Sequence, residues 1–311
     1  MRALLQDDTA GDPMGRRGVW TGKRLRAISR ELAQLGLRVC PNTVRRLLGE
    51  LDYALHANRK SLCASSPERD EQFTYLTYQR QQFRQEGYPI ISVDSKKKEL
   101  VGQFKNPGRV WSQTPILVQD HDFRSQAKGL ATPYGIYDVW ANRALVVVGT
   151  SPDTPDFAVD AIGQWWRQQG HRRYPEAPEL LILADSGGSN GPRCRAWKLA
   201  LQQKVADRFG LAVTVCHYPT GASKWNPVEH RVFSEISKHW AGQPLRDYPT
   251  VVRLIGETHT HTGLRVSCAL NARYYPTKVQ VSAKQMDDLD LLKHVTLPEW
   301  NYTLFPRTIG N

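Results

Sequence analysis

The chain has 311 residues, of which 40% are hydrophobic, so it can bury a core of ordinary size beside a smaller module. It lacks an apolar run of about 18 residues, the length of a membrane-spanning helix, and its first residues lack an apolar secretory stretch. We therefore predict a soluble, cytoplasmic protein. The net charge of +12 indicates a polyanionic partner, most simply nucleic acid.

The five cysteines do not form a recognisable metal or disulfide pattern. Their number is odd and no two of them make a CxxC pair. The sequence therefore predicts neither a zinc knuckle nor a disulfide framework.

Two short amphipathic helices are predicted near the N-terminus, over residues 23–35 and 41–51. Gly36 is suited to end the first in a left-handed conformation, and Pro41 stands at the first position of the second. Two such helices around a turn have the outline of a helix-turn-helix, although an ordinary helical hairpin shows the same pattern.

The second of these helices would expose side chains suited to base edges and phosphates, namely Asn42, Thr43, Arg45 and Arg46. A dense group of arginines and lysines precedes it between residues 16 and 30. We therefore assign residues 1–60 to a helix-turn-helix DNA-binding module. A linker helix is expected within 61–87, ended by Gly87.

From residue 88 onward, short apolar strands alternate with helices. Strands are predicted at 88–94, 133–140, 143–149, 180–185 and 211–216, and helices at 155–169, 192–209 and 227–240. Three strands in succession indicate an antiparallel meander, and the later alternation indicates parallel crossovers. This order predicts an α/β fold of the ribonuclease-H-like type, a mixed five-stranded sheet with flanking helices, over 88–245. The sequence leaves the fold of a C-terminal extension, 246–311, open.

Two aspartates end predicted strands. Asp94 and Asp185 each follow a run of apolar residues, and strand ends are where such sheets expose functional groups. Taken singly, each could also be a simple strand terminator.

A glutamate on the last predicted helix is the third candidate carboxylate. Glu229 lies on the same helical stripe as the apolar residues Phe233, Ile236 and Trp240, and Asn226 before it is suited to cap the helix. A carboxylate on a buried stripe is costly unless it is paired, although a glutamate in a first turn can also serve the helix dipole.

Together, three carboxylates of this kind suit two Mg²⁺ or Mn²⁺ ions that align a nucleophile with a phosphodiester. Basic and aromatic residues near them are candidate DNA contacts: Lys96, Lys97, Lys98, Lys224 and Trp225. A solvated charge run and plain core packing of Trp225 are the alternatives.

Three segments around these carboxylates resemble the signature blocks of ISAzo-type bacterial insertion-sequence transposases, whose DDE domain is also called the Rhodopirellula type. They are ISVDSKKKELVGQFKN (91–106), LADSGGSNGPR (183–193) and HYPTGASKWNPVEHRVFS (217–234). TAGDPMG (9–15) and ANRKSL (57–62) resemble the same family, so the resemblance covers nearly the whole chain.

The resemblance implies that Asp94, Asp185 and Glu229 are the catalytic and metal-binding residues of a transposase. It would cleave the DNA ends of its element and transfer them to target DNA. Separately from the resemblance, we expect a homodimer on DNA that acts at the nucleoid. Family members carry a further segment ahead of TAGDPMG, so we also expect an N-terminal truncation.

Two alternatives remain open at this point. A catalytically decayed DNA-binding regulator would share the helix-turn-helix and the basic charge. A nuclease or an integrase could use the same fold, although the sequence lacks the zinc-binding HHCC module expected of an integrase.

Overall fold

The computed structural model describes residue 4 and residues 9–10, 20–55 and 67–307. The chain forms two compact units, Met1–Leu62 and Cys63–Asn311. Most of the TAGDPMG segment, all of ANRKSL and the basic residues Arg16 and Arg17 lie outside the described residues.

The first unit contains the two predicted helices. Its elements are β1 (Thr9–Ala10), β2 (Trp20–Thr21), α2 (Leu25–Gln34) and α3 (Pro41–Gly49). Ile28, Leu32 and Val44 are buried between the helices, and Gly36 has the left-handed φ of 82° expected of a helix end. Both helices are therefore confirmed, whereas the small antiparallel pair of β1 and β2 was not expected.

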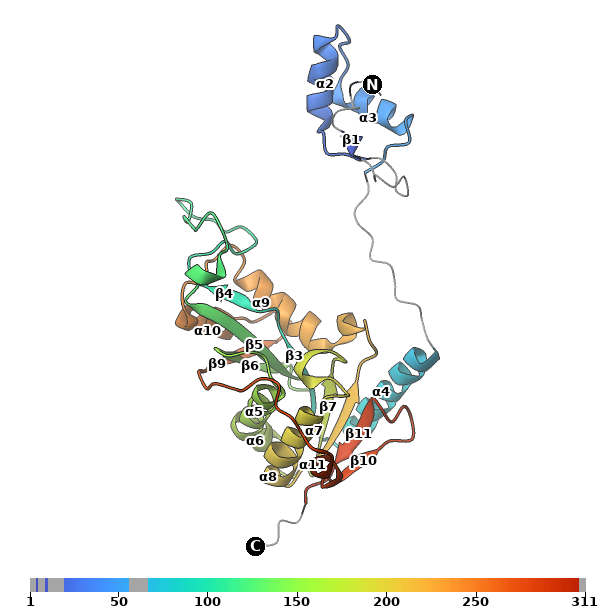
Figure 1. Ribbon diagram of the computed structural model, residues 1–311, viewed down its shortest axis with the longest axis vertical. Coiled ribbons are helices and arrows are strands. Elements are labelled where there is room, and N and C mark those ends of the chain that lie inside the picture. Colours follow the sequence, from blue (N-terminus) through green and yellow to red (C-terminus); the bar gives the residue numbers. More distant parts are fainter. Residues whose placement is uncertain (1–3, 5–8, 11–19, 56–66, 308–311) are drawn as a thin grey trace. The chain divides into compact units, whose positions relative to one another are not determined.

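The second unit holds the remaining elements (Figure 1). Its strands are β3 (Ile90–Ser95), β4 (Glu99–Val101), β5 (Gly129–Asp138), β6 (Arg143–Gly149), β7 (Glu179–Ala184), β8 (Ala212–His217), β9 (Arg265–Asn271), β10 (Leu291–Lys293) and β11 (Asn301–Leu304). Its α-helices are α4 (Pro67–Gln85), α5 (Pro155–Trp165), α6 (His171–Arg173), α7 (Arg195–Leu201), α8 (Asp207–Phe209), α9 (Ser234–His239), α10 (Tyr248–Gly256) and α11 (Ala283–Asp287).

The strands form one mixed sheet in the order β10-β11-β8-β7-β3-β5-β6-β9, with β4 added to β5. Its centre, β6-β5-β3-β7-β8, consists of the antiparallel meander β3-β5-β6 and the parallel strands β3, β7 and β8. This is the ribonuclease-H-like order, so the predicted fold class is confirmed. Strand β4 was not expected.

The three helices predicted from residue 155 onward are each interrupted by a π-helical turn. These turns are η2 (Trp166–Gly170), η4 (Gln202–Ala206) and η6 (Glu229–Phe233). The apolar periodicity still marks the correct buried faces, because Phe233, Ile236 and Trp240 are all buried. A π turn adds one residue to the hydrogen-bonded ring and often occurs at functional sites.

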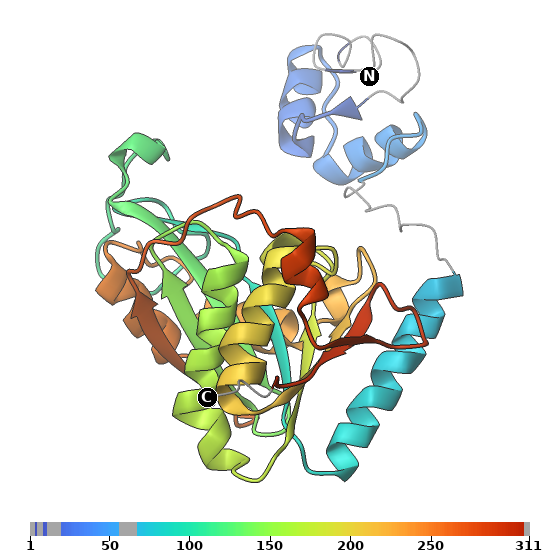
Figure 2. The ribbon, with the colours of Figure 1, turned by 60° about the horizontal axis from the view of Figure 1, so that its bottom comes forward.

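Helices cover both faces of the sheet. One face packs against α5 and α7, and the other packs against α4 on one side and against η6, α9 and α10 on the other (Figure 2). Leu76 and Phe83 of α4 join the core formed with β3, β7 and β8. Helix α4 therefore packs on the sheet of the second unit. No helix in the described ranges is long and apolar enough to cross a membrane.

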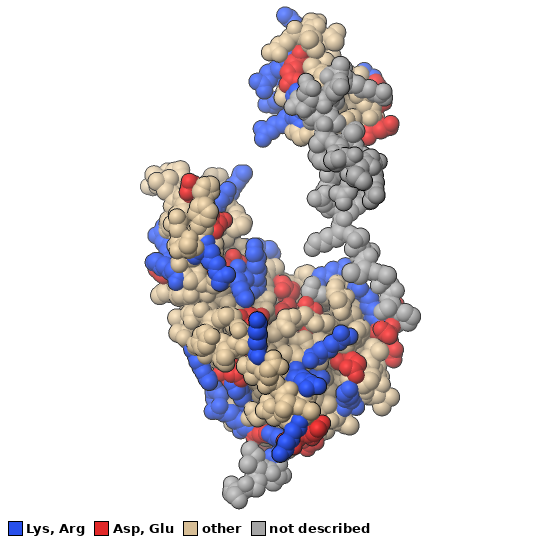
Figure 3. Space-filling model, viewed as in Figure 1, with Lys and Arg blue, Asp and Glu red and all other residues tan. Residues whose placement is uncertain are grey.

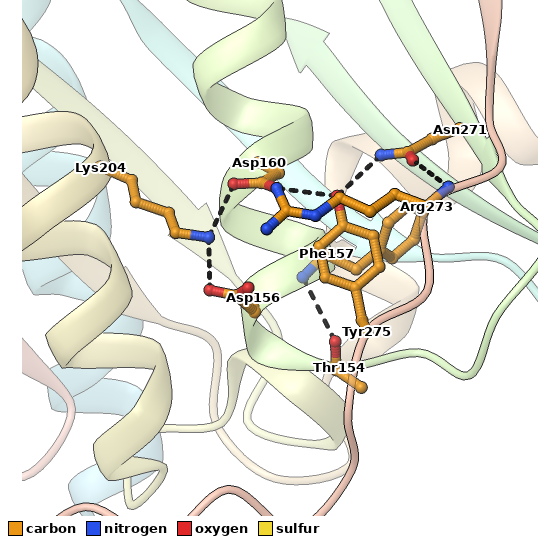
Figure 4. A network of polar contacts seen from close by, with 8 residues as sticks. All are labelled: Thr154, Asp156, Phe157, Asp160, Lys204, Asn271, Arg273 and Tyr275. Carbon is orange, nitrogen blue, oxygen red and sulfur yellow. Dashed lines mark hydrogen bonds and ion pairs between the residues drawn. The ribbon is translucent and has the colours of Figure 1, made fainter.

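The C-terminal residues complete the sheet on both edges. Strand β9 pairs with β6, and the chain then returns past α5 and α7 to place β11 and β10 beside β8 (Figure 2). The buried Tyr275 anchors this return: its hydroxyl donates to Asp160 Oδ2 (2.7 Å) and accepts from Asn271 Nδ2 (2.9 Å). Lys204 Nζ, from η4, lies 2.9 Å from Asp160 and 2.5 Å from Asp156 (Figure 4). One polar network thus holds the C-terminal segment against α5.

Candidate active site

Asp94 and Asp185 lie side by side at one end of the sheet. Strands β3 and β7 are parallel neighbours, and Val93 is aligned with Ala184, so the two aspartates follow in register. Val93 and Ala184 belong to the core beneath α5. Because side chains alternate along a strand, both aspartates project toward the opposite face of the sheet.

The backbone holds both aspartates in the same way. Asp94 Oδ1 accepts a hydrogen bond from Ser95 N (2.7 Å), and Asp185 Oδ1 accepts one from Ser186 N (2.8 Å). Behind them, His217 Nδ1 donates to the backbone oxygen of Asp185 (3.1 Å). Burial lowers the pKa of His217 to about 4, so this histidine is neutral at physiological pH.

The helix that carries Glu229 is tied to β3. The Ser92 hydroxyl accepts a hydrogen bond from Val228 N (3.0 Å) and donates to the buried side chain of Asn226. Asn226 Nδ2 in turn donates to the backbone oxygen of Val93 (3.3 Å). The expectation that Asn226 caps the helix through its side chain is wrong, because its amide binds the strand and Ser92 accepts the first-turn N–H instead.

A glycine lets this helix approach the sheet closely. Gly135 of β5 is the register partner of Asp94. A Cβ atom at this position would lie 2.7 Å from the Phe233 ring and 2.9 Å from a methyl group of Val228. The missing side chain therefore creates the space in which the turn carrying Glu229 reaches the end of β3.

The three carboxylates influence one another electrostatically. Burial, followed by the charges of Asp185 and Glu229, raises the pKa of Asp94 to about 8. Burial also raises the pKa of Asp185 and of Glu229, although for Glu229 the positive charge of Lys96 and a hydrogen bond with Asp94 act in the opposite direction. The structure thus brings the three predicted residues together as a half-buried cluster of electrostatically coupled carboxyl groups.

This cluster is suited to hard divalent cations. Among the described residues, no three His, Cys, Asp or Glu side chains are arranged to hold a single ion together. Mg²⁺, however, usually takes only one or two carboxylates and completes its shell with water and substrate phosphates. The pairs Asp94–Asp185 and Asp94–Glu229 offer such partial sets of oxygen ligands, so the donor chemistry fits Mg²⁺ or Mn²⁺.

The three lysines after Asp94 differ in their surroundings. Lys96 Nζ pairs with Glu99 (2.9 Å) and lies 4.7 Å from the centre of the Trp240 ring, with only 10% of its side chain exposed. Lys97 and Lys98 are exposed. The geometry therefore favours Lys97 and Lys98 as phosphate contacts and gives Lys96 a part in the charge balance around Glu229.

Trp225 combines packing with exposure. Its ring lies 5.4 Å from that of Phe73 on α4, yet 42% of the residue is exposed. Lys224 Nζ and the Arg69 guanidinium lie 3.9 and 5.0 Å from its centre. The Trp225 ring therefore packs against α4 and also leaves part of its surface open to contact.

In the first unit, the candidate DNA contacts of α3 lie mainly at the surface. Asn42, Arg45 and Arg46 are exposed and Thr43 is half-buried. Arg46 forms an ion pair of 2.6 Å with Glu50 one turn further along α3, whereas the described structure gives Arg45 no such partner.

Two residues near the carboxylates were missed by sequence reasoning. The charge of Asp153, in the loop between β6 and α5, contributes to the raised pKa of Asp94. Burial and the charges of Asp153 and Asp94 raise the pKa of the Tyr134 hydroxyl, which has no hydrogen-bond partner in the described structure. Neither residue stands in a motif, so only spatial proximity reveals them.

Solved structures and one protein family resemble this chain. Solved structures that resemble the chain include a Mos1 transposase paired-end complex with left transposon end (15% identity, 82% of this chain and 68% of that chain, TM-score 0.45) and a pre-cleavage Mos1 transpososome (13%, 82% and 69%, TM-score 0.44). Because these likenesses are distant, no conclusion about this chain follows from them. No match was found among curated proteins. The family model described as Rhodopirellula transposase DDE domain, by contrast, matches residues 1–306. The chain therefore belongs to the Rhodopirellula-type DDE transposase family.

Proposed function

We propose that this transposase cleaves the DNA ends of an insertion sequence and transfers them to target DNA, with two Mg²⁺ or Mn²⁺ ions held by Asp94, Asp185 and Glu229. The observation that carries the proposal is the registered pair of aspartates at the ends of β3 and β7, onto which the Ser92 contact brings Glu229. Such ions, when bound, supply activation of the attacking oxygen and stabilisation of the leaving oxygen.

The chain's own side chains would orient the DNA around this cluster. Lys97 and Lys98 are exposed beside Asp94 and can bind backbone phosphates. Lys224 and the partly exposed ring of Trp225 can bind a phosphate and stack on a base. Lys and Arg side chains are spread over the face of the second unit seen in Figure 3, as expected of a surface that contacts a polyanion.

The remaining parts of the chain have roles in this proposal as well. Residues 1–60 would act as the helix-turn-helix module that binds the element ends through Asn42, Thr43, Arg45 and Arg46. Residues 61–87 would link it to the catalytic domain, 88–245, which residues 246–311 extend. Joining involves two element ends, so we propose a homodimer on double-stranded DNA, acting in the cytoplasm at the nucleoid.

The test is incubation of the full chain with a duplex that carries the terminal sequence of its element, in Mn²⁺ or in EDTA. We expect cleavage at the element end and joined products in Mn²⁺, and neither in EDTA. Cleavage without joining would indicate a nuclease. Tight binding of the end without cleavage under any divalent ion would indicate a decayed regulator and contradict the proposal.

A further inference from the structure

A pocket of about 680 Å³ lies at the end of the sheet remote from the carboxylates. Four arginines line it: Arg143, Arg172, Arg173 and Arg265. Arg143 and Arg265 are the first residues of the neighbouring parallel strands β6 and β9, and they are aligned with each other. Like charges on adjacent strands repel each other, so this pair is costly unless an anion lies between them.

The other two arginines come from the helical layer above these strands. Arg172 and Arg173 form the last turn of the helix that begins with α5. Gln169 Nε2, from η2, donates to Ser267 Oγ of β9 (2.8 Å), which holds this helix end over the sheet. The pocket is therefore built by two elements that are fixed to each other.

The protein neutralises these charges only in part, through the electrostatic attraction between Arg173 and the buried Asp138 carboxyl. Within the described ranges, none of the four guanidinium groups forms an ion pair or hydrogen bond, and all four residues are exposed. The one acidic lining residue, Asp138, is buried and already accepts hydrogen bonds from Trp140 N (3.1 Å), Ala141 N (3.0 Å) and the Tyr174 hydroxyl (3.1 Å).

The pocket and the carboxylates open on different faces of the sheet. Arg143 shares its face with Leu145 and Val147, which pack beneath α5. Asp94 projects from the opposite face and is aligned, through Gly135, with Val146, three positions further along β6 than Arg143. Duplex DNA is stiff, with a persistence length of about 150 base pairs, so one short straight segment cannot enter both sites.

We propose that this arginine pocket binds backbone phosphates of a duplex DNA segment other than the one held at the carboxylates. Guanidinium groups match phosphate geometry through paired N–H donors, and four of them in one pocket suit a run of phosphates. Identifying that segment as the second DNA of a joining reaction rests on the proposed function. The binding of phosphates does not.

The test measures binding of the full chain to a duplex of unrelated sequence in EDTA, over a range of salt concentrations. We expect Arg143→Gln with Arg265→Gln, and separately Arg172→Gln with Arg173→Gln, to weaken binding. Each pair should lower the slope of log affinity against log salt by about 1.8, since each lost phosphate contact contributes about 0.9. Arg143→Lys with Arg265→Lys should keep most of the slope, because the charge remains.

A control variant removes two positive charges that already have partners. Arg253→Gln with Lys293→Gln breaks the ion pairs with Glu257 and Glu299 on the surface and should leave the slope unchanged. Thermal unfolding of each variant shows whether the fold is retained. The proposal would be overturned if both double arginine variants were folded and kept the wild-type salt slope. It would also be overturned if inorganic phosphate occupied the pocket and DNA binding did not change. Cleavage plays no part in these measurements, so they stand or fall independently of the proposed function.

A second measurement examines the separate segment directly. The full chain is saturated with unlabelled element-end duplex in EDTA, and capture of a labelled second duplex is then followed. We expect both double arginine-to-glutamine variants to capture the second duplex at least several-fold less than the control variant does. Equal capture by all variants would contradict the assignment of a second DNA to this pocket.

Discussion

The Ser92 hydroxyl accepts a hydrogen bond of 3.0 Å from the backbone N–H of Val228, and this contact joins the strand that carries Asp94 to the turn that carries Glu229. The same hydroxyl donates to the side chain of Asn226. A single serine thus sets the position of one candidate metal ligand relative to another.

Replacing this serine tests its positioning role. Ser92→Ala leaves a buried N–H and a buried amide oxygen without this partner, so we expect a loss of about 1–3 kcal/mol in the free energy of unfolding. A small displacement of Glu229 should also slow cleavage by about 10- to 100-fold. Ser237→Ala is the control. Within the described residues its hydroxyl donates only to Phe233 O of the same helix (2.8 Å), so the change should affect neither quantity appreciably.

The charge of Glu229 is the second test. Glu229→Gln keeps the size and hydrogen-bonding capacity of the side chain but removes an anionic oxygen ligand, so cleavage should fall by roughly two orders of magnitude or more. Stability in EDTA and DNA affinity should be retained, since the change relieves repulsion within the cluster. Glu235→Gln, which alters a glutamate paired with Lys238 (2.6 Å) on α9, should cleave normally. A Glu229 variant with wild-type cleavage would remove this residue from the active site.

Metal binding should depend on pH through Asp94. Its pKa is raised to about 8, so the stability that it contributes is fully present below its ordinary pKa near 4 and is lost as the pH rises through about 8. The metal-free protein should therefore lose stability across this window, and Asp94→Asn should reduce that loss. Because a ligand must be deprotonated, Mn²⁺ should raise Tm more at about pH 8.5 than at about pH 6. An equal gain at both pH values, or an undiminished gain in Asp94→Asn, would count against a metal site here.

The close approach of helix and sheet at Gly135 can be tested with one methyl group. Gly135→Ala places a Cβ against Phe233 and Val228, and overpacking of this kind costs about 1–3 kcal/mol. Cleavage should fall as well, because the helix must move away from β3. Gly256→Ala is the control, since its added Cβ meets Cys268 at an ordinary 3.7 Å. Thermal unfolding and cleavage rates of the two variants should differ clearly.

In the first unit, Arg45 should matter more for DNA binding than Arg46. Arg45 is exposed on α3, whereas Arg46 is already paired with Glu50. Arg45→Ala should lower the salt slope of end-DNA binding by about 0.9, the value of one phosphate contact, and Arg46→Ala should lower it less. Unchanged slopes in both variants would show that α3 does not contact the DNA backbone.

Local patterns in the sequence were sufficient for the central fold. The short, mostly apolar runs before Asp94 and Asp185 predicted strands that end on carboxylates, because such runs are typical of strands buried inside a sheet. The order of strands and helices then predicted the ribonuclease-H-like sheet, and the stripe of Phe233, Ile236 and Trp240 predicted the buried face of the helix after Glu229. Each of these patterns can be recognised from residues close together in the sequence, within about two helical turns or one strand.

Other features depend on contacts between distant parts of the chain. The hydroxyl of Ser92 meets a side chain 134 positions away, and no local property marks either residue as its partner. Strands β9, β10 and β11 carry weak patterns of their own, because they pair with edges that the central sheet already provides.

The arginine pocket is also a feature that depends on contacts between distant parts of the chain. Arg143 and Arg265 each look like an isolated surface residue in the sequence, and only the parallel pairing of β6 with β9 places them side by side. The sequence by itself therefore determined the helices and strands of the central sheet and the three candidate carboxylates, but not β4 or the C-terminal strands. The tertiary structure alone decided how Glu229 is held and where the unpaired positive charges converge, because such long-range contacts arise from the packing of whole elements and not from local propensity.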